Sequence, residues 1–237
     1  MRSRSVSAEQ RPFLLTILSC VQFVVLTAVA MLFYPGGTFV DPLSRGYSFF
    51  RNFFSDLGRT RTHSGEPNTV SAILFFVALT LVGLGLAAFF LAMPRFFQGR
   101  PARLLSRLGA GAGLVSGLSF IGVAFTPADL IGWLHRLFVQ VAFLAFFVAV
   151  LLYIAAILRT GAYPNRYALL FGAFVVLLAA YLVLLFFGPS LLTSRGLIIH
   201  ATGQKIIVYA AVVAALIQAA GARRLGAAGA ARRLPAG

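Results

Sequence analysis

The sequence predicts an all-α integral membrane protein, a bundle of six transmembrane helices with a long first extracytoplasmic loop. Of its 237 residues, 60% are hydrophobic and only 11% are charged, and the mean hydropathy is +0.93. A soluble domain of this length needs a more polar surface. The chain also contains several apolar runs of roughly 20 residues, the length that crosses a hydrocarbon core of about 30 Å as a helix.

Six apolar runs are long enough to span a bilayer, and helices are the form in which single segments satisfy their backbone groups there. We expect spans at about 13–33, 70–93, 108–126, 133–158, 167–187 and 198–219. They form one domain over 13–219, preceded by a cytoplasmic segment at 1–12 and followed by a basic flexible tail at 220–237. A cleavable signal ending near Ala28-Val29-Ala30 is the alternative for the first run, but its length favours a retained span.

The basic residues predict the orientation, because short loops rich in Arg and Lys stay in the cytoplasm. Thirteen fall on the side of the two termini, and seven fall on the other side, namely Arg45, Arg51, Arg59, Arg61, Arg136, Arg195 and Lys205. Both termini are therefore predicted to be cytoplasmic, with membrane lipids as partners of the flanking arginines. The net charge of +15 is explained by this contact with anionic headgroups and not by nucleic-acid binding.

One predicted helix has a stripe of small residues. Gly109, Gly113 and Gly117 recur every four residues along the third span. Small residues at this spacing allow two helices to approach closely in lipid. We interpret the stripe as a packing surface within one bundle and not as a dimer interface, and the sequence leaves the oligomeric state open.

Acidic residues and histidines are concentrated on the predicted outer side. Only Glu9 lies inside, while the outer set comprises Asp41, Asp56, His63, Glu66, Asp129, His135 and His200. The first outer loop is about 36 residues long, and loops of this length are usually functional or disordered. Its paired phenylalanines within 47–58 predict a short interfacial helix that acts as a lid. Ser55 and Asp56 would either cap the end of this segment or lie near the second outer turn.

Three short motifs occur in order along the chain. Ser55-Asp56-Leu57-Gly58 follows the first span, Pro127-x-Asp129 precedes His135, and the last helix starts in a Gly-rich and basic segment. In this combination, the chain from about Phe13 to Ala219 resembles the prokaryotic membrane family catalogued as domain of unknown function 998. The resemblance implies a six-helix protein of a prokaryotic plasma membrane, and it implies no activity.

Three classes of function remain open. A binding protein would hold a lipid headgroup or the loops of a membrane partner in a polar outer pocket, formed by Arg51, Asn52, Arg136, Arg195, Gln204 and Lys205 around an anion. Salt bridges from Arg51 to Asp56 and from Arg136 to Asp129, without any ligand, are the structural alternative.

The second class is a membrane hydrolase. Its candidate catalytic residues are Ser55, Asp56, Asp129, His135 and His200. No metal site is assigned, but a metal would bind His135, His200 and either Asp56 or Asp129. The sequence identifies no cofactor.

The third class is a small-molecule or proton-coupled transporter. It depends on polar groups at mid-membrane depth, for which Gln22, Gln140 and Tyr181 are the candidates. We interpret them instead as partners in hydrogen bonds between helices.

Overall fold

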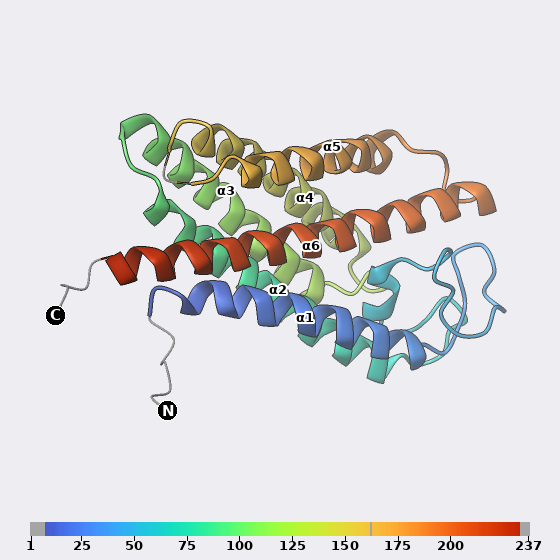
Figure 1. Cartoon of the computed structure of the whole chain (residues 1–237). Helices are drawn as coiled ribbons and strands as arrows, with labels where there is room; N and C mark the ends of the chain where they lie inside the picture. Colours follow the sequence, from blue (N-terminus) through green and yellow to red (C-terminus); the bar gives the residue numbers. More distant parts are fainter. Residues whose placement is uncertain (1–7, 162, 233–237) are drawn as a thin grey trace, which may run out of the picture.

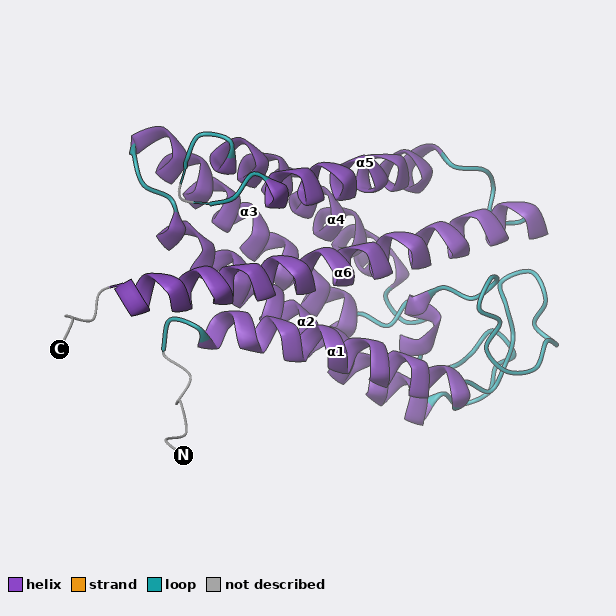
Figure 2. Cartoon of the chain, viewed as in Figure 1, coloured by secondary structure: helices purple, strands orange, loops and turns teal. Residues whose placement is uncertain are grey.

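The structure is a computed structural model that describes residues 8–161 and 163–232. These residues form six α-helices, which are α1 (Arg11–Leu32), α2 (Thr69–Ala92), α3 (Arg100–Phe125), α4 (Gly132–Ile157), α5 (Arg166–Phe187) and α6 (Ser194–Arg232) (Figure 2). Two 3-10 helices, η1 (Phe54–Gly58) and η2 (Met93–Phe96), lie between them. All six α-helices are long and apolar enough to cross a membrane.

Each helix packs against the next, and α6 packs against both α1 and α5, which closes the ring. The described parts of both chain ends lie at one end of the bundle, here called the termini end (Figure 1). The opposite end, here called the loop end, carries the α1–α2 connection 33–68, the α3–α4 turn 126–131 and the α5–α6 turn 188–193. The loop end therefore holds four of the five acidic residues and all three histidines.

The expected spans are present, with two differences at their ends. Helix α3 begins at Arg100 and not near 108, because Pro101 suits the first turn and the following Ala, Arg and Leu favour a helix although they are not uniformly apolar. Helix α6 continues to Arg232, so 220–232 is helical where the sequence predicted a flexible tail. Alanine-rich sequence favours this extension. Residues 233–237 of that predicted tail lie outside the described part.

The small residues of α3 pack inside the bundle, as the sequence predicted. A methyl group added to Gly113 would lie 2.1 Å from the ring of Phe90, and one added to Gly117 would lie 2.7 Å from the carbonyl oxygen of Gly83. Gly109 faces Tyr153 of α4. The glycines thus bring α3 close to α2 and α4.

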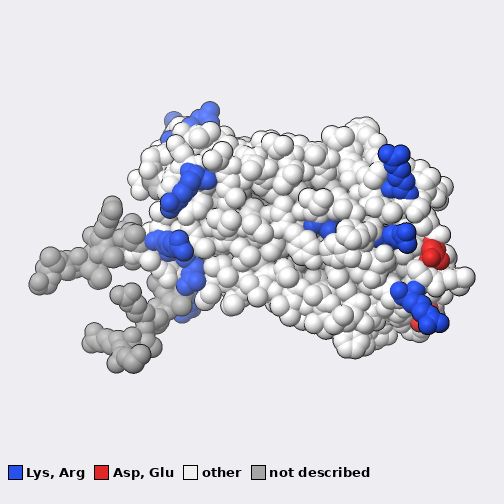
Figure 3. All heavy atoms as spheres, turned by 45° about the vertical axis from the view of Figure 1, so that its right-hand side comes forward, with Lys and Arg blue, Asp and Glu red and all other residues white. Residues whose placement is uncertain are grey.

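The outer face of the bundle suits lipid. Large apolar side chains such as Leu18, Leu84, Val148 and Val183 are exposed along the helices. In Figure 3, the blue Lys and Arg atoms gather mainly at the two ends of the visible face, and the red acidic atoms lie at one of them. A broad apolar band between charged ends is the surface expected of a protein that spans a bilayer.

Candidate functional site: a lid packed on the last helix

The α1–α2 connection, residues 33–68, folds over the loop end and is here called the lid. Its 3-10 helix η1 inserts Phe54 and Leu57 into the bundle, where they are 3% and 0% exposed. The phenylalanine ring packs against Phe23 of α1 and Tyr209 of α6, with ring centroids 5.9 and 5.6 Å apart. This insertion holds the lid on the bundle.

The predicted amphipathic helix over 47–58 is reduced to turns followed by η1. The Asn52 side chain accepts a hydrogen bond from the backbone N–H of Ser48 at 2.9 Å, and Asp56 accepts one from the N–H of Phe53 at 2.9 Å. These side chains compete with the backbone for helical hydrogen bonds. Asp56 therefore caps the start of η1, whereas the sequence suggested a cap at the end of the segment 47–58.

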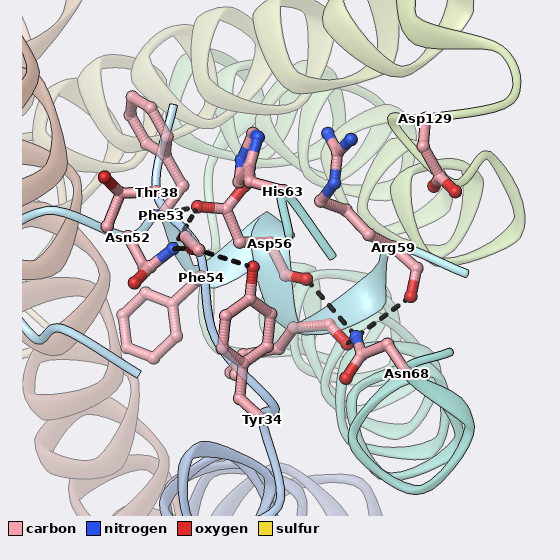
Figure 4. A network of polar contacts seen from close by, with 12 residues as sticks. Tyr34, Thr38, Asn52, Phe53, Phe54, Asp56, Arg59, His63, Asn68 and Asp129 are labelled. Atoms are coloured by element: carbon pink, nitrogen blue, oxygen red, sulfur yellow. Dashed lines mark hydrogen bonds and ion pairs between the residues drawn. The ribbon is translucent and has the colours of Figure 1, made fainter. Parts of the chain in front are cut away.

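Asp56 lies at the centre of the polar network in Figure 4. It is 5% exposed, and both carboxylate oxygens have partners. Oδ1 lies 3.1 Å from Nε2 of His63, and Oδ2 accepts from Nδ2 of Asn52 at 3.1 Å as well as from Phe53. This buried carboxylate organises the lid from within.

The lid closes on itself at Gly37. Its carbonyl accepts from Nδ2 of Asn52 at 2.9 Å and from the hydroxyl of Tyr34 at 3.3 Å. Gly37 has φ of +86°, and an added methyl group would lie 2.4 Å from the backbone nitrogen of Ser64, so only glycine fits here. Burial, together with the nearby Asp56 carboxylate, raises the pKa of Tyr34 above its ordinary value, and this phenol remains a neutral donor.

Two other elements of the bundle bind the lid. From α2, the hydroxyl of Ser71 donates to the carbonyl of Leu57 at 3.2 Å, next to Asn68, the last residue of the lid, whose Nδ2 donates to the carbonyls of Leu57 and Arg59, both at 2.9 Å. At the α3–α4 turn, Asp129 accepts from the hydroxyl of Thr60 at 2.6 Å and from the N–H of Arg61 at 3.0 Å. Partial burial would raise the pKa of Asp129, but these hydrogen bonds outweigh it, and the pKa lies below its ordinary value.

Helix α6 meets the lid through Gln204 and Lys205, which are 8% and 2% exposed. Oε1 of Gln204 accepts from the backbone N–H of Phe54 at 2.7 Å. Nζ of Lys205 donates to the carbonyl of Asn52. The same ammonium lies 5.2 to 5.4 Å from the ring centroids of Phe49, Tyr47 and Phe54. An aromatic cage of three rings from the lid thus surrounds a cation from α6.

The structure does not gather all the candidate residues of the sequence into one pocket. Asn52 and Asp56 of the lid meet Gln204 and Lys205 of α6 in a buried region, whereas Arg51, Arg136 and Arg195 are exposed. Among the described residues, His63 is the only basic partner within ion-pair distance of an acid. The two salt bridges considered from the sequence, Arg51 to Asp56 and Arg136 to Asp129, are therefore not formed.

The two histidines considered for catalysis lie on different helices, His135 on α4 and His200 on α6. Nδ1 of His135 bonds to the carbonyl of Thr126 at 2.7 Å, so this nitrogen holds the proton and Nε2 is left without a partner among the described residues. Nε2 of His200 bonds to the carbonyl of Pro189 at 3.0 Å. The described residues contain no group of three His, Cys, Asp or Glu side chains placed to share a metal ion.

Sequence reasoning missed three contributors to this site. Tyr47 donates to the carbonyls of Phe53 and Asn52, at 3.0 and 3.3 Å, and forms one wall of the cage. Thr60 joins the lid to Asp129, and Asn68 holds the carbonyls of Leu57 and Arg59. All three residues belong to the long first loop, and their place in that loop was the signal that the sequence offered.

The fold and the site define a six-helix integral membrane protein whose loop end is closed by a folded lid anchored to the last helix. The family model described as "Protein of unknown function (DUF998)" matches residues 27–221, and the chain belongs to this family. No curated protein and no solved structure matches the chain.

Proposed function

We propose that the protein binds an anionic membrane lipid at Lys205, beneath the lid. The observation that supports this function is the burial of a cation that has no carboxylate partner. Lys205 is 2% exposed, and Asp56–His63 is the one ion pair within the described residues. Buried charges in membrane proteins are costly and usually mark functional sites.

The protein satisfies this ammonium only in part. An ammonium has three N–H donors, and the Asn52 carbonyl accepts from one of them. The aromatic rings add attraction of about 0.5–2 kcal/mol, whereas removing an ion from water costs several kcal/mol. Asp56 cannot compensate directly, because His63, Asn52 and Phe53 already occupy its oxygens. A phosphate or carboxylate would supply the missing charge and accept the remaining donors.

A ligand reaches Lys205 when the lid moves away from α6. Two hydrogen bonds join these parts, one from Phe54 to Gln204 and one from Lys205 to Asn52. Each is worth about 1 kcal/mol in net stability, or somewhat more where a charge takes part. An anionic headgroup is a stronger hydrogen-bond partner for Lys205 than the Asn52 carbonyl of the lid. Binding of the lipid would therefore favour replacement of the bond between Lys205 and the lid by a bond between Lys205 and the headgroup.

We further propose that the loop end faces the extracytoplasmic side of a prokaryotic plasma membrane, with both termini in the cytoplasm. The excess of arginines at the termini end supports this orientation. Single cysteines at two exposed positions test it in intact cells with a membrane-impermeant maleimide. We expect labelling of Glu66→Cys and not of Gln98→Cys, and the reverse pattern would invert the topology. The native Cys20 is buried and gives little background.

Native mass spectrometry of the gently solubilised protein tests the proposed function. We expect the wild type to retain an anionic lipid and Lys205→Met to lose it by about ten-fold or more, which corresponds to about 1.4 kcal/mol. Arg195→Gln is the matched control, because Arg195 lies on the same helix at the same end but is exposed. Equal retention in all three proteins would refute the proposal.

The same sample distinguishes lipid binding from metal-assisted hydrolysis. We expect no stoichiometric zinc in the purified protein. Zinc that disappears when His135 and His200 are both replaced by alanine would instead support a hydrolase. The structure does not favour that chemistry, since the hydroxyl of Ser55 makes no hydrogen bond to another described side chain and the two histidines bond to separate turns.

A further inference from the structure

The bundle contains an apolar cavity that is lined by residues of five helices. Its volume is about 70 Å³, and it lies between α1, α2, α3, α4 and α6. Cys20 and Phe23 line it from α1, and Val208, Val212 and Ala215 line it from α6. Residues 208–215 extend over roughly 10 Å of helix, so the cavity follows the bundle axis away from Lys205.

Phe54 contacts both the Lys205 ammonium and Phe23, a residue that lines this cavity. The Phe54 ring packs against the ring of Phe23, which lines the cavity, with the centroids 5.9 Å apart. The Lys205 ammonium lies 5.4 Å from the centroid of the same Phe54 ring. Because Phe54 belongs to the lid, a movement of the lid away from α6 would displace this ring from both neighbours.

We propose that the ligand is a single-chain anionic amphiphile, a fatty carboxylate or an alkyl phosphate, whose head pairs with Lys205 and whose chain enters this cavity past Phe54. This inference rests on the proposed function and names its ligand class. The volume of the cavity is about half the roughly 150 Å³ that admits benzene in an engineered protein core. A chain therefore needs the space that Phe54 occupies, which makes the lid residue the gate.

Charge, and not hydrophobicity, selects this ligand. An alkyl chain that leaves a bilayer for an apolar cavity exchanges one apolar environment for another and gains little. Pairing with Lys205 is the interaction that lipid tails cannot offer. A neutral alcohol with the same chain should consequently not compete for the cavity.

Cys20 provides a native reporter for the cavity, since it is the chain's single cysteine and is 2% exposed. We would measure its modification by methyl methanethiosulfonate with intact-mass spectrometry, in phosphatidylcholine nanodiscs. Laurate or dodecyl phosphate should slow the modification of the wild type by about ten-fold at saturation, and the more protective of the two identifies the head. Dodecanol and inorganic phosphate should leave the rate unchanged.

Two variants test the gate without ligand. Phe54→Ala should speed the modification of Cys20 by about ten-fold, because it opens the route to the cavity. Phe49→Ala should not, because Phe49 contacts Lys205 but makes no ring contact with Phe23 or Tyr209. Equal rates in the two variants would overturn the assignment of Phe54 as the gate.

The outcomes separate this inference from the proposed function. If an anionic lipid binds in a Lys205-dependent way but neither amphiphile protects Cys20, the chain lies elsewhere and only the cavity assignment falls. If dodecanol protects as well as laurate, charge does not select the ligand and the inference falls. If the Lys205→Met variant still retains the lipid and laurate still protects its Cys20, both this inference and the proposed function are refuted.

Discussion

The side-chain oxygen of Gln204 accepts a hydrogen bond from the backbone N–H of Phe54 at 2.7 Å, across 150 positions of sequence. This bond fixes the lid to the last helix beside Lys205. Both partners are buried, so neither can turn to water if the other is lost. The position of the lid therefore depends on a residue that lies outside it.

Gln204→Leu should loosen the lid. It leaves the Phe54 N–H without an acceptor, at a cost of about 1–3 kcal/mol. We expect faster hydrogen–deuterium exchange in residues 52–58, with little change in α3 and α4. Gln98→Leu is the control, because Gln98 is exposed at the termini end. Unchanged exchange in the lid would show that this hydrogen bond does not hold it.

Lys205→Met should not lower the thermal stability of the unliganded protein. The substitution removes a poorly matched buried charge, and such replacements are often neutral or stabilising by about 1–4 kcal/mol. The Asn52 carbonyl keeps a donor, since the Tyr47 hydroxyl also reaches it at 3.3 Å. A thermal shift assay on lipid-depleted protein measures the effect. A large loss of stability would assign Lys205 a structural role.

The contact of Asp129 with the lid should weaken in acid. Because the folded-state pKa lies below the ordinary value of 3.8, the ionised carboxylate contributes stability above that value, and the contribution is lost as the pH falls through the folded-state pKa. Wild type and Asp129→Asn should differ most near neutral pH and converge below about pH 4. Exchange of the Thr60 and Arg61 amides against pH measures this. Asp41→Asn, at an exposed carboxylate of the same lid, serves as the control.

Gly113→Ala should destabilise the bundle, whereas Gly111→Ala should not. The added methyl group at 113 would overlap the buried Phe90 ring, and overpacking of this kind costs about 1–3 kcal/mol. The same change at 111 meets nothing within 4 Å. Thermal unfolding of the two variants in one detergent compares them directly. Equal stabilities would mean that α2 and α3 separate at little cost.

The sequence determined the class of fold because the constraint is local. A helix that spans a bilayer must be apolar over about 20 residues, and this pattern is visible without knowledge of any contact. Six such runs also place the loops alternately at two ends, which brings Asp56, Asp129 and His135 to one end. The small residues of α3 predicted close packing for the same reason, since their spacing lies within a single helix.

Tertiary structure decided which polar side chains meet. Lys205, Arg136 and Arg195 are all basic residues in the loop-end halves of their helices, yet only Lys205 is buried, because α6 turns it toward the lid. Asp56 pairs with His63 and not with Arg51, since the hydrogen bonds of Asn52 and Gly37 set the path of the lid. These contacts depend on how a long loop folds back on distant helices. Hydropathy along the chain contains no information about that packing, because contacts across 150 residues depend on the shapes of surfaces that form only when the bundle assembles.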